Sequence, residues 1–461
     1  KISRDAWDVP TRASLRGFFH HRAGQEWKKP WADWDQPRAF HPDNGEDYWE
    51  LSKSQLDMEL MGGRHEDYMG TGKFNEWKTG KKVPNAWGGY YDAGDYDRHT
   101  AHLICSRNML ELLELFPEYY RSFDLPIPEA GNNLPDLLDE ALWAIDLYRR
   151  TQRDDGGVYG GIETNGHPNK GEPAFLDSLT RCVFAPDPRS SWRYAASAAR
   201  AAFVLDRLNE ETAADAYLRS AIKAMKWAEQ EYLTRSSYFE KHKSWWQIED
   251  YRNLAAVALY RMTGDEAWRQ VFENTCVFKE SAAVSQHGKG NQQEAAFIYA
   301  TMPDELTDPA IKANAVKGIE VLAREQIQYS DGIPFMWSAP EGNRWIPLLC
   351  SINSTPHGQP LCRAYTLTRK KEYLEYAVRT TLNSVGANPQ NMTFTSRLGH
   401  RYPEFPLQCN RYYMHQPRPY TGYTVYGLYA HGPAPWWVGK WFVTEQSAAP
   451  KLAEWPIAES Y

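Results

Sequence analysis

The sequence lacks three features that would each define a class of protein. No run of about 18 apolar residues occurs among its 461 residues, so we expect no membrane-spanning helix. Positive charge is not in excess, since 52 Lys and Arg face 59 Asp and Glu and the net charge is −7. Dedicated nucleic-acid-binding proteins neutralise phosphates with clustered basic residues, so we exclude that class. Lys1–Arg4 carry no apolar stretch, and a signal peptide is expected to be absent or already removed.

Cysteine is also scarce, and the common motifs of serine-nucleophile enzymes and of nucleotide-binding proteins are absent. Six cysteines lie far apart, and none forms a Cys-x-x-Cys pair or a zinc-finger arrangement with histidine. We interpret them mostly as single thiols, and a Cys350–Cys362 bridge stays open. The sequence contains no Gly-x-Ser-x-Gly elbow, no P-loop and no Gly-x-Gly-x-x-Gly fingerprint. Serine-nucleophile and nucleotide-dependent enzymes are therefore disfavoured.

Aromatic residues are abundant instead. They make up 14% of the chain and include 19 Trp. Aromatic rings build cores, and they also stack on the C–H faces of sugar rings. The pairs Trp245-Trp246 and Trp436-Trp437 stand beside polar residues, which favours a surface groove for part of this aromatic content.

Apolar residues at helical spacing dominate from residue 100 onward. We find no convincing strand alternation and no linker, so we predict one all-α domain over residues 1–461. Helix pairs joined by alternating short and long loops can close into an α/α barrel with a cleft at one end. An early helix is predicted over Asp47–Leu60, with Asp47 as its N-cap. The other predicted helices are Ile104–Leu115, Leu134–Tyr148, Trp192–Leu208, Thr212–Tyr232, Tyr251–Thr263, Asn291–Ala300, Ile311–Gln328 and Lys371–Ser384, with Arg363–Thr368 as the end of another.

The segment Asn85–Thr100 carries the strongest chemical pattern. Asp92, Asp95 and Asp97 lie within six residues and are flanked by glycines, which let the backbone bend and approach a ligand closely. Two carboxylates three residues apart in a tight turn can hold one water molecule as a nucleophile. A calcium loop or a solvated turn stays open as the alternative, although the spacing is not that of an EF-hand.

The run Gly-Gly-Tyr-Tyr-Asp-Ala-Gly-Asp, which ends at Asp95, resembles the motif near the N-terminus of glycoside hydrolase family 9 catalytic domains. The resemblance continues in the family's order over roughly residues 14–461. It implies an (α/α)₆ barrel, a sugar-binding cleft and inverting hydrolysis of a β-glycosidic bond. The further segments that resemble the family are Asn133–Trp143, Asp155–Tyr159, Trp192–Ala202, Gly386–Pro389 and Gly427–Pro433.

The resemblance also implies roles for the acids. Inverting hydrolysis needs a base that activates water and an acid about 6.5–9.5 Å away that protonates the leaving oxygen. By resemblance Asp95 is the base and Asp92 helps to hold the water. Asp97 is expected to be structural, paired with Arg98. Tyr91, within the motif, is a candidate substrate contact, and so is His357, for which a simple turn is the alternative.

Two departures from the family pattern affect the predicted site. The family's acid is a Glu in an Asn-Glu-x-Ala-type motif before the last helix, and that motif is missing. We expect the natural chain to continue beyond Tyr461, so that the acid and the last helix of the domain lie outside this sequence. The alternative is an acid that has diverged, and Glu459 is then the candidate within this sequence. Leu407 and Cys409 stand where the family has a sugar-binding His and Arg. His400, Arg401 and Arg411 are the candidate replacements.

These features together predict a hydrolase of β-1,4-linked glycans, of the cellulase or β-glucanase type. An exo-acting glucosaminidase or oligosaccharide hydrolase stays open, with Glu404 as a partner for an amino sugar. A carbohydrate-binding protein without catalysis is the alternative of another class. The expected partner is a β-linked polysaccharide or oligosaccharide, with no nucleic acid and no membrane, and protein partners are unknown. The resemblance implies a secreted or periplasmic location and no cofactor, and it leaves a structural calcium ion open.

Overall fold

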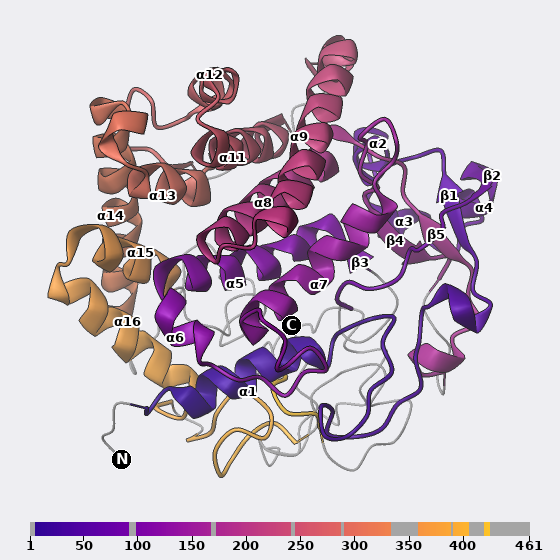
Figure 1. Cartoon of the computed structure of the whole chain (residues 1–461), viewed down its shortest axis with the longest axis horizontal. Helices are drawn as coiled ribbons and strands as arrows, with labels where there is room; N and C mark the ends of the chain where they lie inside the picture. Colours follow the sequence, from indigo (N-terminus) through magenta and orange to yellow (C-terminus); the bar gives the residue numbers. More distant parts are fainter. Residues whose placement is uncertain are drawn as a thin grey trace.

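The computed structural model describes residues 5–91, 98–166, 172–240, 245–286, 290–332, 358–388, 391–404 and 419–424. Helices joined in antiparallel pairs dominate this part of the chain, which confirms the predicted helical barrel (Figure 1). The helices of eight or more residues are α1 (Asp8–Phe19), α5 (Leu103–Leu115), α7 (Asp136–Thr151), α8 (Pro188–Arg207), α9 (Glu211–Thr234), α11 (Trp245–Thr263), α12 (Glu266–Thr275), α13 (Gln293–Thr301), α14 (Pro309–Asp331), α15 (Gln359–Thr368) and α16 (Lys371–Ser384).

Shorter helices and strands lie beside the ring of long helices. A five-stranded sheet with the order β2-β1-β5-β4-β3 lies beside the ring of helices, together with α2, α3 and α4 (Figure 1). The short helices are α2 (Gln55–Leu60), α3 (His65–Tyr68), α4 (Lys73–Trp77), α6 (Pro117–Arg121) and α10 (Ser236–Glu240). The strands are β1 (Tyr48–Leu51), β2 (Lys78–Lys82), β3 (Arg98–His99), β4 (Gly161–Thr164), β5 (Arg181–Val183) and a separate pair, β6 (Ser285–Gln286) and β7 (Gly290–Asn291).

Local sequence signals explain where the long helices begin. Asp187 precedes α8, and its carboxylate accepts a hydrogen bond from Ser190 N at 2.7 Å. Asp308 caps α14 in the same way, and proline follows both caps at the first helical position, where no N–H is needed. The alanine-rich body of α8 is buried almost throughout and packs between α9 and α11. Its small side chains allow this close packing on several sides.

The predicted helix over residues 47–60 is wrong in its first half. Tyr48–Leu51 form β1, which pairs with β2 and β5. The helix α2 begins only after Ser54, whose hydroxyl accepts from Asp57 N at 3.0 Å while the Asp57 carboxylate accepts from Ser54 N. This capping box, and not Asp47, sets the start of the helix. The strands escaped prediction because each has only two to five residues, too few to show alternation.

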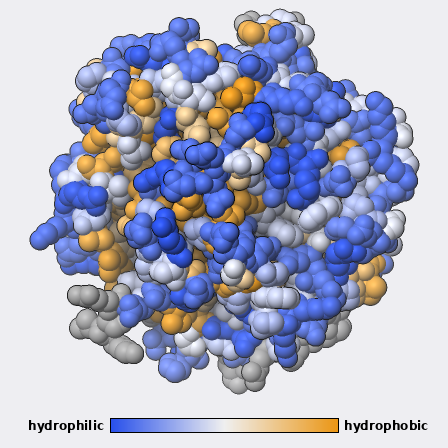
Figure 2. Space-filling model, viewed as in Figure 1, coloured by the Kyte–Doolittle hydropathy of each residue, from blue (hydrophilic) through white to orange (hydrophobic). Residues whose placement is uncertain are grey.

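Aromatic residues contribute largely to the core. Trp27 and Trp192 are fully buried, and so are Tyr194 and Tyr299. The face of the molecule in Figure 2 is mainly hydrophilic, with hydrophobic residues gathered in the left and central part of the view. No helix of the described residues is long and apolar enough to cross a membrane. Cys362 carries a free thiol, and Cys350, the other member of the bridge left open above, lies outside the described residues.

The first helix is fastened by a late segment of the chain. Gly17 of α1 and Gly422 touch through their backbones, and a side-chain carbon at either position would overlap the other residue. Gly422 also has a φ of 100°, which glycine adopts readily. The Tyr423 hydroxyl donates to the His20 carbonyl at 3.0 Å across 403 residues of sequence. The N-terminal helix is therefore held by a segment from near the other end of the described chain.

A buried network of ion pairs, which we call the axial network, joins five helices. Arg200 of α8 lies at its centre and donates to Glu114 of α5 at 3.0 Å and to Glu294 of α13 at 2.7 Å. Arg261 of α11 binds Glu114 at 2.7 Å. Arg107 of α5 binds Glu294, and Arg363 of α15 binds Glu111 of α5 at 2.7 Å.

Charges buried in this way must stay paired. Burial alone would raise the pKa of Glu114, but the guanidinium groups of Arg200 and Arg261 lower it to about 2. Removing one member of a buried pair leaves an uncompensated charge, which costs more than the pair contributes when intact. The axial network therefore fixes how the five helices sit against one another.

We predict that Glu114→Gln lowers the free energy of unfolding by about 3–5 kcal/mol, because Arg200 and Arg261 lose their shared carboxylate. Urea denaturation followed by circular dichroism measures this loss. The matched control is Glu375→Gln on α16, which removes an exposed pair with Arg379. That change should cost no more than about 0.5 kcal/mol. Equal losses in the two variants would contradict the role given to the network.

Candidate active site

The N-terminal parts of five helices meet at a pocket of about 270 Å³. These helices, α5, α8, α11, α13 and α15, therefore point their N-termini toward the same end of the barrel. The segment with the three aspartates directly precedes β3 and α5 in the sequence, and α5 begins at this end of the barrel. The charged and polar residues that line the pocket include Arg107, Asn108, Arg193, Asp250, Tyr251, Glu294, Gln359 and Arg363.

The backbone before the aspartates is held from two sides. Ala23 N donates to the Gly89 carbonyl at 2.9 Å, and Tyr91 N donates to the His21 carbonyl at 2.8 Å. From the α7 side, the Trp143 indole donates to the same Gly89 carbonyl at 3.1 Å. Gly89 has a φ of 79° and packs on Leu147, which leaves no room for a larger residue without strain.

Tyr90 anchors this backbone in the core. Its hydroxyl donates to the Glu140 carboxylate at 2.8 Å, and Arg22 binds the same carboxylate through two nitrogens at 3.1 and 3.0 Å. Burial raises the pKa of Glu140, and the Arg22 guanidinium opposes that shift. Neighbouring Tyr91 is 5% exposed and packs against Trp27 and Phe40. The Tyr90 and Tyr91 rings therefore hold the backbone that leads into the aspartate segment.

The backbone after the aspartates is also fixed. Arg98 and His99 form β3, which pairs antiparallel with β4. The Arg98 side chain is buried, and its guanidinium lies over the rings of Phe40, at 5.1 Å, and Tyr48, at 5.8 Å. Thr100 N donates to the Gly160 carbonyl at 3.1 Å. The described backbone is thus held in place on both sides of the aspartate segment, at Tyr91 and at Arg98.

The pocket floor combines fixed positive charge with one unusual acid. Arg193 lies 4.3 Å from the centre of the Tyr251 ring, and its charge lowers the pKa of the Tyr251 hydroxyl. Burial raises the pKa of Asp250 to about 6, although its carboxylate accepts a hydrogen bond from Asn291 N at 2.7 Å. Arg107 and Arg363 reach the pocket from the axial network. The floor therefore offers donors to the oxygen atoms of a polar ligand.

Several residues predicted from the sequence lie outside the described residues: Asp92, Asp95, Asp97, His357, Arg411 and Glu459. Their roles stay predictions. The side chains of the two Trp-Trp pairs are likewise outside the description. His400 and Arg401 are described and exposed, on a loop where Thr393 N donates to the Arg401 carbonyl at 2.9 Å. Tyr91 is in the core, where its observed part is that of an anchor, and contact with a sugar stays a prediction.

Sequence reasoning missed the pocket floor. Arg107 and Arg363 each interrupt a mainly apolar stretch, and an ionic side chain on the inward face of a helix was the available signal. Glu294 and Asp250 carried no such signal, because both stand beside other polar residues. Only the assembled barrel brings them together.

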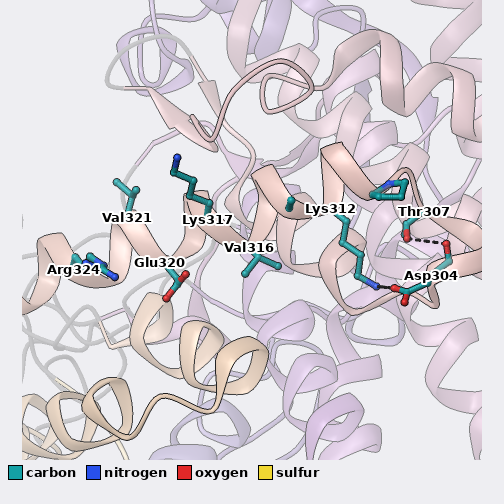
Figure 3. Close-up of a pocket in the computed structure, with 10 residues that line it drawn as sticks. Asp304, Thr307, Lys312, Val316, Lys317, Glu320, Val321 and Arg324 are labelled. Carbon is teal, nitrogen blue, oxygen red and sulfur yellow. Dashed lines mark hydrogen bonds and ion pairs between the residues drawn. The ribbon is translucent and has the colours of Figure 1, made fainter.

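A second hollow, of about 950 Å³, runs along the outer side of α14 (Figure 3). Its lining comes almost entirely from that one helix and the turn before it. Lys312 reaches back to Asp304 at 2.7 Å, and Glu320 is bound by Lys370 and Tyr373. The carboxylates there are paired and lie along one helix surface, so this hollow is not the candidate active site.

Comparisons with known proteins agree on one family. A family model described as Glycosyl hydrolase family 9 matches residues 9–451. A xyloglucan-specific endo-β-1,4-glucanase of Bacteroides ovatus is 24% identical over 86% of this chain and 66% of its own length. Endoglucanase C of Cellulomonas fimi is 24% identical over 75% of this chain and 32% of its own length. The chain thus spans about two thirds of the first relative and about a third of the second.

Solved structures show the same fold. A metagenome-derived family 9 endoglucanase superposes with a TM-score of 0.74 at 22% identity, covering 93% of this chain and 73% of the other. An endoglucanase from the termite Nasutitermes takasagoensis gives a TM-score of 0.64 at 15% identity, covering 92% and 91%. The barrel is therefore an (α/α)₆ barrel, as predicted.

We predict that Asp250→Asn changes how stability depends on pH. The folded protein binds a proton on Asp250 at about pH 6, and the unfolded chain binds it near 3.8, so ionisation weakens folding as pH rises between these values. Asparagine removes that loss. The stability of the variant relative to wild type should therefore grow from pH 4 to pH 7, by about 3 kcal/mol at most. Urea denaturation at a series of pH values measures it, and a difference independent of pH would refute the shift.

Proposed function

The chain belongs to glycosyl hydrolase family 9, and from this membership we propose that it hydrolyses β-1,4-linked glycans with inversion at the anomeric carbon. The observation that carries the proposal is the way in which the described residues before and after the aspartate segment are held. These residues are fixed by Tyr90 and β3, at the barrel end where five helix N-termini meet. A rigid support is what a pair of acids needs in order to hold one water in line for attack.

In the proposed mechanism Asp95 takes a proton from the attacking water, and Asp92 holds that water in place. A carboxylic acid on the other side of the glycosidic bond protonates the leaving oxygen, at the separation of about 6.5–9.5 Å typical of inverting enzymes. Glu459 is the proposed acid within this sequence. The reaction uses water and carboxyl groups alone, so no cofactor is part of the proposal.

The proposed substrate is a soluble, short or substituted β-glycan. The Bacteroides ovatus relative is named for xyloglucan, a substituted β-1,4-glucan, and this supports a branched substrate. The polar, arginine-rich floor of the pocket supports binding through hydroxyl groups. Relatives in the family typically act outside the cell, which supports secretion as part of the same proposal.

We predict that Asp95→Asn lowers kcat about 10²–10⁴-fold or more, because the general base is lost while shape and sugar binding persist. Asp92→Ala should also lower turnover, since one carboxylate alone positions the water poorly. Reducing-sugar release from xyloglucan and soluble β-glucan measures both. Asp97→Asn is the matched control, two residues along the chain, and should retain most activity. Near-normal turnover of the Asp95→Asn variant would show that Asp95 is not the general base. A wild-type protein that binds these glycans without releasing reducing ends would be a binding protein.

We predict weak activity on crystalline cellulose and better activity on soluble or substituted β-glycans, because Leu407 and Cys409 cannot make the strong hydrogen bonds of His and Arg. Alanine at His400, Arg401 or Arg411 should raise KM or lower kcat on the best substrate. Thermal unfolding should change little, since His400 and Arg401 are exposed.

The control for that series is Arg121→Ala, which removes an exposed arginine at the end of α6. Viscosity loss compared with monosaccharide release distinguishes endo from exo action. If insoluble cellulose is the best substrate and all three alanine changes are silent, the segment has no part in specificity.

A further inference from the structure

The candidate active-site pocket contains an arginine that no described carboxylate neutralises. Arg193 of α8 lines this pocket, and among the described residues its guanidinium forms no ion pair. Two carboxylates lie in its neighbourhood, and both are bound elsewhere. Glu59 binds Arg189 through both oxygens, at 2.7 and 2.8 Å. Asp187 caps α8 by accepting from Ser190 N. The charge of Arg193 is therefore available to a ligand.

The surroundings of Arg193 are poor in hydrogen-bond acceptors. Burial lowers the pKa of the guanidinium, since little water remains to stabilise its charge. Its Nε atom is buried and has no hydrogen-bond partner in the described part of the chain. The side chain instead lies 4.3 Å from the centre of the Tyr251 ring. Arginine stays charged in such a place, and a buried charge without a counter-ion is costly, so an anionic ligand would relieve that cost.

The other charged residues of the pocket do not cancel this charge. Glu294 already accepts from Arg107 at 2.9 Å. Burial raises the pKa of Asp250 to about 6, so in mildly acidic solution this carboxyl is mostly uncharged. Arg363 also lines the pocket, and its Nη1 atom has no hydrogen-bond partner within the described ranges. The lining thus carries more positive charge than negative charge.

Two helix N-termini add to the positive potential. Gln293 is the first residue of α13 and Gln359 is the first residue of α15, and both line the pocket. The first N–H groups of a helix have no partner within the helix, and the helix dipole places partial positive charge there. The neutral side chains at these two positions leave that potential in place. Arg193 and the two helix ends therefore favour the same sign of ligand charge.

We propose that this pocket binds the carboxylate of a uronic acid residue, and that Arg193 selects β-glycans carrying such an acidic sugar. The inference rests on the proposed function as a glycan hydrolase and specifies its substrate class. A carboxylate offers two oxygens that match the fork of a guanidinium, whereas the hydroxyls of a neutral sugar leave the charge uncompensated. The ammonium of an amino sugar would be repelled. The pocket volume of about 270 Å³ favours a single sugar residue.

Isothermal titration of the full-length wild-type chain at pH 6 with three disaccharides of similar size tests the proposal. The probes are cellobiose, which is neutral, glucuronyl-β-1,4-glucose, which is anionic, and glucosaminyl-β-1,4-glucose, which is cationic. We expect the anionic disaccharide to bind about tenfold more tightly than cellobiose, and the cationic one to bind most weakly. The preference should shrink as salt is raised. Chromatography after each titration shows whether the ligand has stayed intact.

Arg193→Gln keeps a polar side chain of similar reach and removes the charge. This variant should lose about tenfold in affinity for the anionic disaccharide and stay within about twofold of wild type for cellobiose. Arg193→Lys should recover part of the loss, because it restores the charge without the fork. The matched control is Arg219→Gln, which removes an exposed arginine of α9 and should bind all three probes as wild type does. Thermal unfolding followed by circular dichroism checks the fold of each variant.

The wild-type chain alone can overturn the inference, by binding cellobiose as tightly as the anionic disaccharide. An Arg193→Gln variant that folds normally and loses equal affinity for both would overturn it too. Reducing-sugar release from neutral and glucuronate-containing β-glycans is measured in parallel. Hydrolysis without preference for the anionic ligand contradicts this inference and leaves the proposed function standing. Selective binding of the anionic disaccharide without hydrolysis of any glycan contradicts the proposed function and supports the binding site.

Discussion

The pairing of Arg200 with Glu114 and Glu294 is the interaction on which the barrel most depends. A guanidinium that is almost fully buried cannot be left without carboxylates, so α8 must bring α5 and α13 to it at hydrogen-bonding distance. Arg261 of α11 and Arg363 of α15 also pair with carboxylates of α5, so these two helices are held to α5 in the same way. Apolar packing alone would tolerate some sliding of helices along one another, whereas these bidentate and shared contacts do not. The common alignment of the five N-termini at the pocket follows from this constraint.

Different interactions hold the chain before and after the aspartate segment. At its entry, Tyr90, Glu140 and Arg22 form a charged hydrogen-bonded unit inside the core. At its exit, β3 is held by main-chain pairing with β4 and by stacking of Arg98 on two rings. A mutation that weakens one support leaves the other, so positioning of the segment should degrade gradually. Proteins often place reactive groups on short segments carried by a rigid frame, because the frame limits their movement.

The sequence predicts the long helices well, and it predicts little of what joins them. Apolar spacing over Leu103–Leu115 or Pro309–Asp331 is a local property, so it can be read without the fold. The strand over Tyr48–Leu51 depends on partners far along the chain, and its four residues carry no pattern of their own. The pocket floor is equally non-local. Its members have no characteristic spacing, and only the folded chain reveals them.

The contact between Gly17 and Gly422 also has a consequence for biosynthesis. Ribosomes add about 5–20 residues per second, so the 403 residues that separate His20 from Tyr423 take about 20–80 s to make. During that interval α1 has emerged, but the segment that fastens it does not yet exist. Until then, the apolar side of α1, which carries Leu15 and Phe19, can be covered only by partly folded neighbouring segments or by chaperones. Completion of the barrel is thus tied to late translation, and nascent chains of this protein should be more sensitive to proteases and aggregation than the released one.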